Sequence, residues 1–203
     1  MFLKNVKTSL EKISKSLEDV HNSREYLIKN TREVVILCSQ SIIAIHKGDL
    51  KAAHKKVQEA KKVLSRNRKM VKSDLRRYLI TPEQELVEAY ALLSIVEGKP
   101  IPSAKSLGVL NESYVLGLLD CIGELKRLVF DKIRTDKSKD AEKFFELMEN
   151  LYLHLYPFAT YDKIVREARR KIDVNRILIE DTRSAITEEI RRIELIKTLN
   201  QKK

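Results

Sequence analysis

The sequence predicts an all-α protein, folded as a bundle of about six long antiparallel helices. Glycine and proline are scarce, with 5 Gly and 4 Pro in 203 residues, so few points force a helix to stop. Apolar residues recur at helical spacing along most of the chain, and no strand-like alternation flanked by turn residues occurs. The length and the hydrophobic content of 43% suit a single domain over residues 1–203.

The first predicted helix covers residues 3–47, a range without glycine or proline, as one very long helix or as two stacked end to end. Gly48 ends this segment, and Asp49 is expected to cap the next helix. That second helix is predicted over residues 50–79, because apolar residues keep one helical face throughout it.

The later elements are predicted from start and stop signals. Thr81 precedes Pro82 and is the expected cap of a third helix that runs to about Glu97. The remaining elements are a loop over 98–111, a helix capped by Asn111 from Glu112 to about Arg134, a helix from Lys139 to about Leu155, and a last helix capped by Thr160 that runs to about Leu199.

The chain is strongly basic. Its 40 Lys and Arg exceed its 29 Asp and Glu, which gives a formal net charge of +11. Such a charge favours a polyanionic partner, with nucleic acid first and an anionic membrane surface second, although a basic soluble protein without either partner is the alternative. Between Lys51 and Arg77 the sequence has 11 Lys or Arg and two acids, so this helix presents either a polyanion-binding surface or a solvated face.

Several chemistries are not indicated. The sequence contains no phosphate-binding glycine loop, no HExxH zinc motif and no GxSxG elbow, and its four histidines lack ligand spacing. Cys38 and Cys121 are far apart and are expected to be small buried side chains. We find no signal peptide and no apolar run of membrane-spanning length, and therefore expect a cytoplasmic protein with no membrane partner.

Two carboxylates stand out at the start of the third predicted helix. Glu85 and Glu88 are three residues apart, so both point to the same side of the helix. The rest of this helix is apolar nearly all round, which is typical of a buried helix. Because an unpaired buried charge is costly, the two acids need a cation, and Lys, Arg or a metal ion would each serve.

Asp120 and Glu124 form a second pair, four residues apart on the fourth predicted helix. They lie on the face of Gly117, away from the main apolar face, so the pattern alone also allows this to be the solvent side. A mid-helix glycine costs about 1 kcal/mol relative to alanine, and Gly117 would clear space for a ligand or for another backbone.

We interpret the two pairs as facing each other around a divalent metal ion. Carboxylate ligands without His or Cys suit Mg²⁺ or Mn²⁺, which can activate water and stabilise charge on a phosphodiester. The alternative is that the acids lie on the surface in ordinary ion pairs, which are common on helical bundles.

At these two segments the chain resembles the translin superfamily, and within it the catalytic branch TRAX (translin-associated factor X). The N-terminal half and the layout of the last helix, with Arg169-Arg170-Lys171, are also similar. The specific motifs are Gln84-Glu85-x-Val87-Glu88-Ala89 and Tyr114-x-Leu116-Gly117-x-x-Asp120-x-x-Gly123-Glu124-Leu125-x-Arg127.

The resemblance implies an all-helical subunit of a closed homo-oligomer, usually of eight subunits. It implies a metal-dependent endoribonuclease acting on single-stranded RNA, with single-stranded DNA as a second candidate ligand. Its catalytic and metal-binding acids would be Glu85, Glu88, Asp120 and Glu124, a set that is incomplete in translin. The alternatives are a non-catalytic, translin-like oligomer that binds single-stranded RNA or DNA, and a helical scaffold whose acids form salt bridges.

Overall fold

The computed structural model describes residues 3–201, without the side chains of residues 73 and 74. This range contains α-helices and two short 3-10 helices but no strand, so the predicted all-α class is confirmed. The α-helices are α1 (Lys4–His46), α2 (Leu50–Lys69), α3 (Ile80–Val96), α4 (Ala104–Leu107), α5 (Asn111–Arg134), α6 (Ser138–Leu155) and α7 (Ala168–Gln201), and the 3-10 helices are η1 (Ser73–Leu79) and η2 (Tyr156–Tyr161). Because α4 is a single turn, six long helices remain, as predicted.

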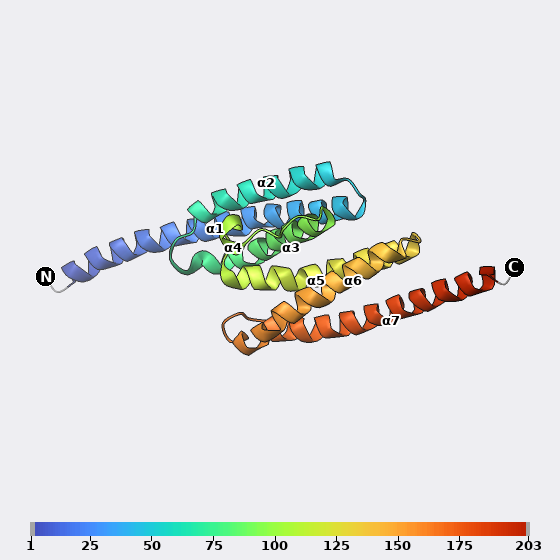
Figure 1. The fold of residues 1–203 in the computed structure, drawn as a ribbon. Coiled ribbons are helices and arrows are strands. Elements are labelled where there is room, and N and C mark those ends of the chain that lie inside the picture. Colours follow the sequence, from blue (N-terminus) through green and yellow to red (C-terminus); the bar gives the residue numbers. More distant parts are fainter. Residues whose placement is uncertain (1–2, 202–203) are drawn as a thin grey trace.

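The long helices lie side by side, with the two ends of the chain projecting at opposite ends of the bundle (Figure 1). Helix α1 packs against α2 and α3, α3 packs against α5, and α5 packs against α6 and α7. Helices joined by short turns are antiparallel, whereas α3 and α5 run in the same direction because the long connection between them returns to the start of α3 (Figure 1). There the backbone N–H of Leu110 donates to Glu83 at 2.8 Å.

Helix α3 is the innermost element of the bundle. Its apolar side chains are buried on all sides, including Leu86, Val87, Ala91 and Leu92 at 0% exposure. They belong to one hydrophobic core that also takes side chains from α1, α2, α5, α6 and α7. The sequence prediction of a helix buried all round is therefore confirmed. No helix in the described part of the chain combines the length and the apolar run that a membrane crossing requires.

The N-terminal region forms as predicted. It is one helix of 43 residues, not two. Gly48 follows it with a φ of +79°, in the left-handed region that glycine adopts without strain, and the Asp49 carboxylate then accepts from the Ala52 N–H at 2.9 Å. The buried Ser41 hydroxyl donates to the Ala53 carbonyl at 2.9 Å, which fastens α1 to α2.

The second predicted helix is too long. Helix α2 ends at Lys69, and Lys72 is extended, with φ −115° and ψ 141°. The chain then turns into η1, whose Leu75 and Leu79 are both buried in the core. A continuous helix would carry these two leucines away from α3, so tertiary packing overrides a local sequence that lacks any helix-breaking residue.

Three predicted caps are wrong. Thr81 lies in the first turn of α3, because η1 continues directly into this helix and supplies the carbonyl partners that a cap would otherwise replace. Thr160 lies in η2, and α7 begins only at Ala168, after Glu167 in a left-handed conformation with φ +72°. Asp162, rather than Thr160, accepts from the first turn of α7, at 3.0 Å from the Arg169 nitrogen. The Asn111 prediction errs by one residue, because Leu110 is the cap.

Gly117 lies where α5 passes too close to α3 for a larger residue. A Cβ atom at this position would lie 2.4 Å from the Gln84 carbonyl oxygen and 2.7 Å from the Val87 Cβ. Of the two reasons that the sequence suggested for this glycine, the structure supports the approach of another backbone. The contact places Gln84 and its neighbours directly opposite the acids of α5.

We expect Gly117→Ala to lower the free energy of unfolding by about 1–3 kcal/mol, because α3 and α5 must separate to admit the methyl group. Gly123→Ala on the same helix is the matched control, since a Cβ there meets no atom within 4 Å. That control should gain about 1 kcal/mol from helix propensity. Urea unfolding of both variants measures the difference, and equal effects would contradict this account of Gly117.

Candidate functional site

Helices α3 and α5 bring the four sequence-predicted acids into one place. Glu85 and Glu88 come from α3, and Asp120 and Glu124 come from α5. We call these four residues the acid cluster. All four are partly buried, and each of Glu85 and Glu88 lies within electrostatic reach of both acids on α5. The parallel course of the two helices produces this meeting, because it sets both pairs at similar depths along the bundle.

Asp120 is held by side chains from two other segments. The Gln84 amide of α3 donates to one of its carboxylate oxygens, and the Lys171 ammonium of α7 donates to the other. Helix α7 is fixed against α5 by the buried Asn175, whose amide donates to the Leu119 carbonyl at 2.9 Å. Lys171 is therefore a built-in cation beside the acid cluster.

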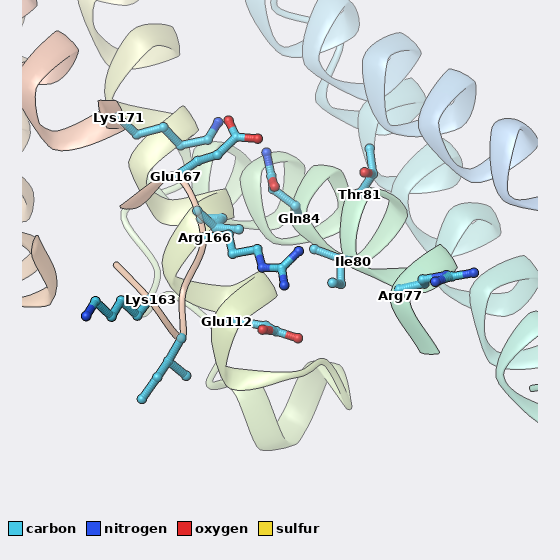
Figure 2. Close-up of a pocket in the computed structure, with 11 residues that line it drawn as sticks. Arg77, Ile80, Thr81, Gln84, Glu112, Lys163, Arg166, Glu167 and Lys171 are labelled. Carbon is cyan, nitrogen blue, oxygen red and sulfur yellow. The ribbon is translucent and has the colours of Figure 1, made fainter. Parts of the chain in front are cut away.

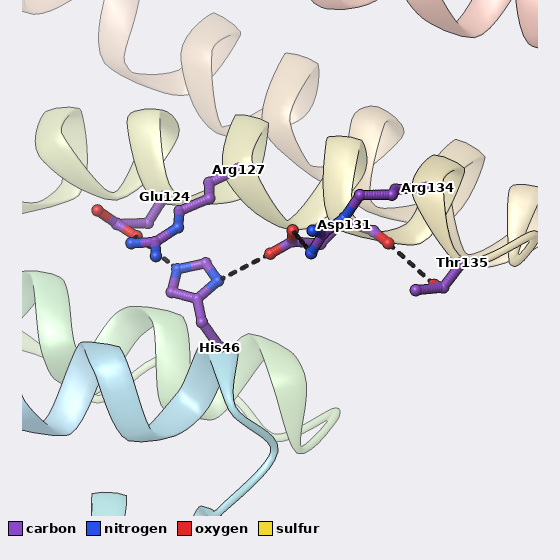
Figure 3. Close-up of polar contacts among 6 residues, drawn as sticks. All are labelled: His46, Glu124, Arg127, Asp131, Arg134 and Thr135. Carbon is purple, nitrogen blue, oxygen red and sulfur yellow. Dashed lines mark hydrogen bonds and ion pairs between the residues drawn. The ribbon is translucent and has the colours of Figure 1, made fainter.

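His46, at the end of α1, holds Glu124 (Figure 3). Its Nε2 lies 2.5 Å from the Glu124 carboxylate, and its Nδ1 lies 3.6 Å from an Asp131 carboxylate oxygen. The imidazole is only 5% exposed, so this contact is shielded from water. Arg127 lies 3.8 Å from the same Glu124 oxygen, from the more exposed side.

The acids destabilise one another's charged forms. Burial, and then the carboxylates of Asp120, Glu85 and Glu124, raise the pKa of the Glu88 carboxyl to about 9. Burial also raises the pKa of Glu85, with the Asp120 carboxylate as the next cause, and Lys171 opposes both shifts. The cluster is therefore short of positive charge.

Two buried thiols lie close to the acid cluster. Cys38 of α1 and Cys121 of α5 are both free and fully buried, as expected from the sequence. Burial is the main cause that raises the pKa of each thiol, and the carboxylates of the cluster add to it. Both cysteines therefore remain uncharged packing residues.

The donor set of the cluster fits a hard divalent cation. Four carboxylates outnumber the two nearby cations, Lys171 and Arg127, and oxygen-only ligation suits Mg²⁺ or Mn²⁺. Among the described residues, however, no three carboxylate, histidine or cysteine side chains lie close enough together to hold one ion. Each acid of α5 has another partner in this arrangement, since Asp120 pairs with Lys171 of α7 and Glu124 contacts the His46 imidazole of α1.

The raised pKa of Glu88 predicts how stability depends on pH without metal. Glu88 stays protonated in the folded protein up to about pH 9 but ionises near its ordinary pKa once unfolded. The folded state then binds the extra proton, so the free energy of unfolding should fall as pH rises from about 5 to about 9. Glu88→Gln, which mimics the neutral acid, should be more stable than the wild type by up to about 5 kcal/mol at pH 8, because pH 8 lies about 3.5 units above the ordinary pKa and each unit is worth about 1.4 kcal/mol.

Urea unfolding with a chelator at pH 5.5 and pH 8.5 tests this expectation. Glu146→Gln, at an exposed position on α6, is the control and should leave the pH profile as in the wild type. Equal pH profiles for the wild type and Glu88→Gln would show that Glu88 does not carry the buried proton.

Sequence reasoning missed three residues that contact the acid cluster. Gln84 opens one of the two carboxylate motifs, but the sequence indicates no role for it at the site, and the histidines show no ligand spacing. His46 and Lys171 come from α1 and α7, far from the acids along the chain. His46 and Lys171 could have been found only from the resemblance of their segments to the translin superfamily, which extends beyond the two carboxylate motifs.

Comparison with known proteins decides the family. The model of the Translin family matches residues 3–180. The chain belongs to the translin family. The uncharacterized protein MJ0175 of Methanocaldococcus jannaschii is 37% identical over 181 residues, which cover 88% of this chain and 81% of that protein.

Solved structures of similar proteins share the whole translin fold. The crystal structure of AfC3PO is 32% identical, with a TM-score of 0.81 over 91% of this chain and 98% of that chain. The structure of the AfC3PO–duplex RNA complex is 30% identical, with a TM-score of 0.82 over 91% and 97% of the two chains. Apo-NeC3PO, at 22% identity and a TM-score of 0.78 over 89% and 96%, shows the fold alone.

Proposed function

We propose that this translin-family protein is an endoribonuclease of the TRAX type, dependent on Mg²⁺ or Mn²⁺ and acting on single-stranded RNA. The observation that carries the proposal is the acid cluster. Four carboxylates from two neighbouring helices come within electrostatic reach of one another in a partly buried place, where the nearby cations are Lys171 and, at 3.8 Å from Glu124, Arg127. Such a concentration of charge is unfavourable for folding alone, which is typical of a functional site.

Each residue has a role in this proposal. Glu85, Glu88, Asp120 and Glu124 would hold the metal ion. When bound, the ion would activate water and stabilise the charge that develops on the phosphodiester. Gln84 and Lys171 orient Asp120, and His46 orients Glu124. The acids of the cluster would also position or deprotonate the attacking water.

RNA as the ligand is supported by charge and by a relative. The net charge of +11 favours a polyanion. The related AfC3PO has been solved with duplex RNA, so a duplex belongs beside the single strand in any assay. Affinity should fall steeply with salt, because phosphate contacts dominate nucleic-acid binding. Single-stranded DNA remains the second candidate ligand.

We further propose that the protein is a homo-oligomer, with eight subunits as the expected count. The first half of α1 carries an exposed apolar stripe at alternating spacings of three and four residues, as in a two-helix seam. Its members are Leu3, Val6, Leu10, Ile13 and Leu17, and they are 48–72% exposed. Such a stripe suits a second copy of this chain, and native mass spectrometry would give the number of subunits.

A second candidate function is RNA binding without cleavage. The contacts of Asp120 with Lys171 and of Glu124 with His46 favour it, because they give two of the four acids a partner without metal. A chelator titration of the wild-type protein separates the candidates. The nuclease hypothesis expects chelator to stop cleavage of a labelled single-stranded RNA while binding persists, with cleavage restored by Mn²⁺ or Mg²⁺. No cleavage at any metal concentration, with binding intact, would favour the binding-only protein.

A further inference from the structure

A cavity of about 720 Å³ opens beside the acid cluster, where the start of α3, the first turns of α5 and the segment before α7 meet (Figure 2). Two of its lining residues, Gln84 and Lys171, are the same side chains that hold Asp120. The cavity and the acid cluster are therefore neighbours that share a wall. Its volume lies within the range of pockets that bind small molecules, and it has room for one nucleotide.

The cavity is lined with more positive than negative side chains. Four basic residues face two acids, and one of these acids, Glu167, is paired with Arg170 at 2.7 Å. Lys171 is engaged by Asp120. The basic residues of the lining are Arg77, Lys163, Arg166 and Lys171. The lining therefore has a surplus of positive charge, as an anion site requires.

Arg166 is the basic residue best placed to meet a ligand. Its guanidinium lies in the middle of the cavity, between Gln84 and Glu112 (Figure 2). Among the described residues, neither Arg166 nor Lys163 forms a hydrogen bond or an ion pair. Guanidinium groups bind phosphate oxygens in a bidentate manner, and a nearby lysine adds charge.

Apolar side chains complete the cavity. Ile80 of α3, Leu116 of α5 and Ile164 from the segment before α7 line it together with the basic residues. Ile164 is 71% exposed, which leaves a large apolar surface available for contact. A purely inorganic anion makes no use of such surface, whereas a nucleotide presents both a phosphate and a flat base.

We propose that this cavity seats one nucleotide of the RNA strand, next to the phosphodiester that is cut. Its phosphate would contact Arg166 and Lys163, and its base would pack on the apolar side chains. The position relative to the cut rests on the proposed function, because Gln84 and Lys171 connect the cavity to Asp120. A nucleoside monophosphate carries the same chemistry and should occupy the cavity by itself.

Binding measured in chelator tests this inference without cleavage. The variant Lys163→Gln/Arg166→Gln removes two positive charges from the cavity and leaves Lys171 in place. Lys139→Gln/Lys143→Gln is the matched control, because it removes two exposed lysines from α6. Calorimetry with uridine monophosphate should show at least tenfold weaker binding for the cavity variant and less than twofold change for the control.

Fluorescence anisotropy with a labelled oligouridylate tests the same inference on an RNA strand. The slope of log affinity against log salt should flatten by about 0.7 for each phosphate that the cavity variant no longer neutralises. Arg166→Lys keeps the charge but cannot bind a phosphate in a bidentate manner, so its affinity should fall between those of the wild type and the double variant. Thermal unfolding checks that all variants remain folded.

The outcomes separate this inference from the proposed function. Uridine monophosphate and oligouridylate binding equal to the wild type in a folded cavity variant would overturn the inference, whether or not the wild type cuts RNA. Loss of oligouridylate binding without any loss of uridine monophosphate binding would also overturn it. If the cavity variant binds both uridine monophosphate and oligouridylate more weakly, as expected, but the wild type cuts no RNA with metal, the cavity is a nucleotide-binding site and the nuclease proposal fails.

Discussion

Replacing Glu88 with Gln is expected to reduce metal-dependent RNA cleavage roughly a thousandfold, because a bound metal supplies several kcal/mol of transition-state stabilisation. Glu88 is the acid most crowded by the others, and its charge appears in the folded protein only when a cation offsets the neighbouring carboxylates. The amide of Gln matches the shape of the neutral acid but cannot become the anionic ligand. Binding of Mn²⁺ should weaken at least tenfold in the same variant.

This variant separates chemistry from folding. Most variants of buried acids lose activity and stability together, whereas Glu88→Gln is expected to be more stable than the wild type without metal. Oligouridylate binding in chelator should stay within twofold, because Glu88 adds no positive charge to the RNA surface. Glu59→Gln, at an exposed position on α2, is the control for a general effect of removing an acid.

The measurement is the single-turnover cleavage rate of a labelled single-stranded RNA in Mg²⁺ and in Mn²⁺, with Asp120→Asn assayed in parallel. Rates within threefold of the wild type for both variants would remove the acid cluster from the chemistry. Loss of cleavage in Asp120→Asn alone would mean that the metal ligands lie on α5. The raised pKa of Glu88 would then reflect its burial and not a role in catalysis.

The first half of the acid cluster could be predicted from local sequence. A helix that is apolar all round must be buried, so the placement of Glu85 and Glu88 beside the core followed from helical geometry. The same geometry did not decide whether Asp120 and Glu124 belong to a functional site or lie on the solvent side of their helix. Only the resemblance to the translin superfamily gave them the same weight as Glu85 and Glu88, and the structure places the four acids within electrostatic reach of one another.

The residues around the acids could not be predicted in the same way. His46 and Lys171 reach the acid cluster because α1 and α7 pack beside α3 and α5, and no local pattern encodes that arrangement. The cavity has the same origin, because Arg166 and Lys163 lie in a segment that the sequence assigned to the last helix. Helical periodicity identifies a buried face but does not say which helix covers it.

The largest loss of stability is expected at Glu83, one residue before Gln84. This carboxylate is 2% exposed. One oxygen accepts from the Arg68 Nε at 3.0 Å, and the other accepts from the Leu110 N–H at 2.8 Å. Arg68 also reaches the Leu107 carbonyl at 3.4 Å, so a single buried ion pair joins α2, the start of α3 and the loop that leads into α5.

We expect Glu83→Ala to lower the free energy of unfolding by about 3–5 kcal/mol, because the Arg68 charge would remain partly buried without its partner. Glu97→Ala, which breaks the surface contact with His54 at 2.8 Å, is the control and should cost about 1 kcal/mol or less. Urea unfolding of both variants measures the difference. A cost for Glu83→Ala as small as that of the control would mean that water replaces the carboxylate at Arg68.

A double variant shows what the ion pair contributes beyond the charges themselves. Glu83→Met/Arg68→Met removes both charges and keeps apolar volume, so much of the stability removed by Glu83→Ala should return. The return should not be complete, because the Leu110 N–H would still lack its acceptor, at a cost of about 1–3 kcal/mol. Full recovery would show that this N–H has no need of Glu83. Partial recovery of stability would show that the Leu110 N–H needs the Glu83 carboxylate. Glu83 would then hold the start of α5 beside the start of α3, and the position of the four acids depends on that parallel arrangement.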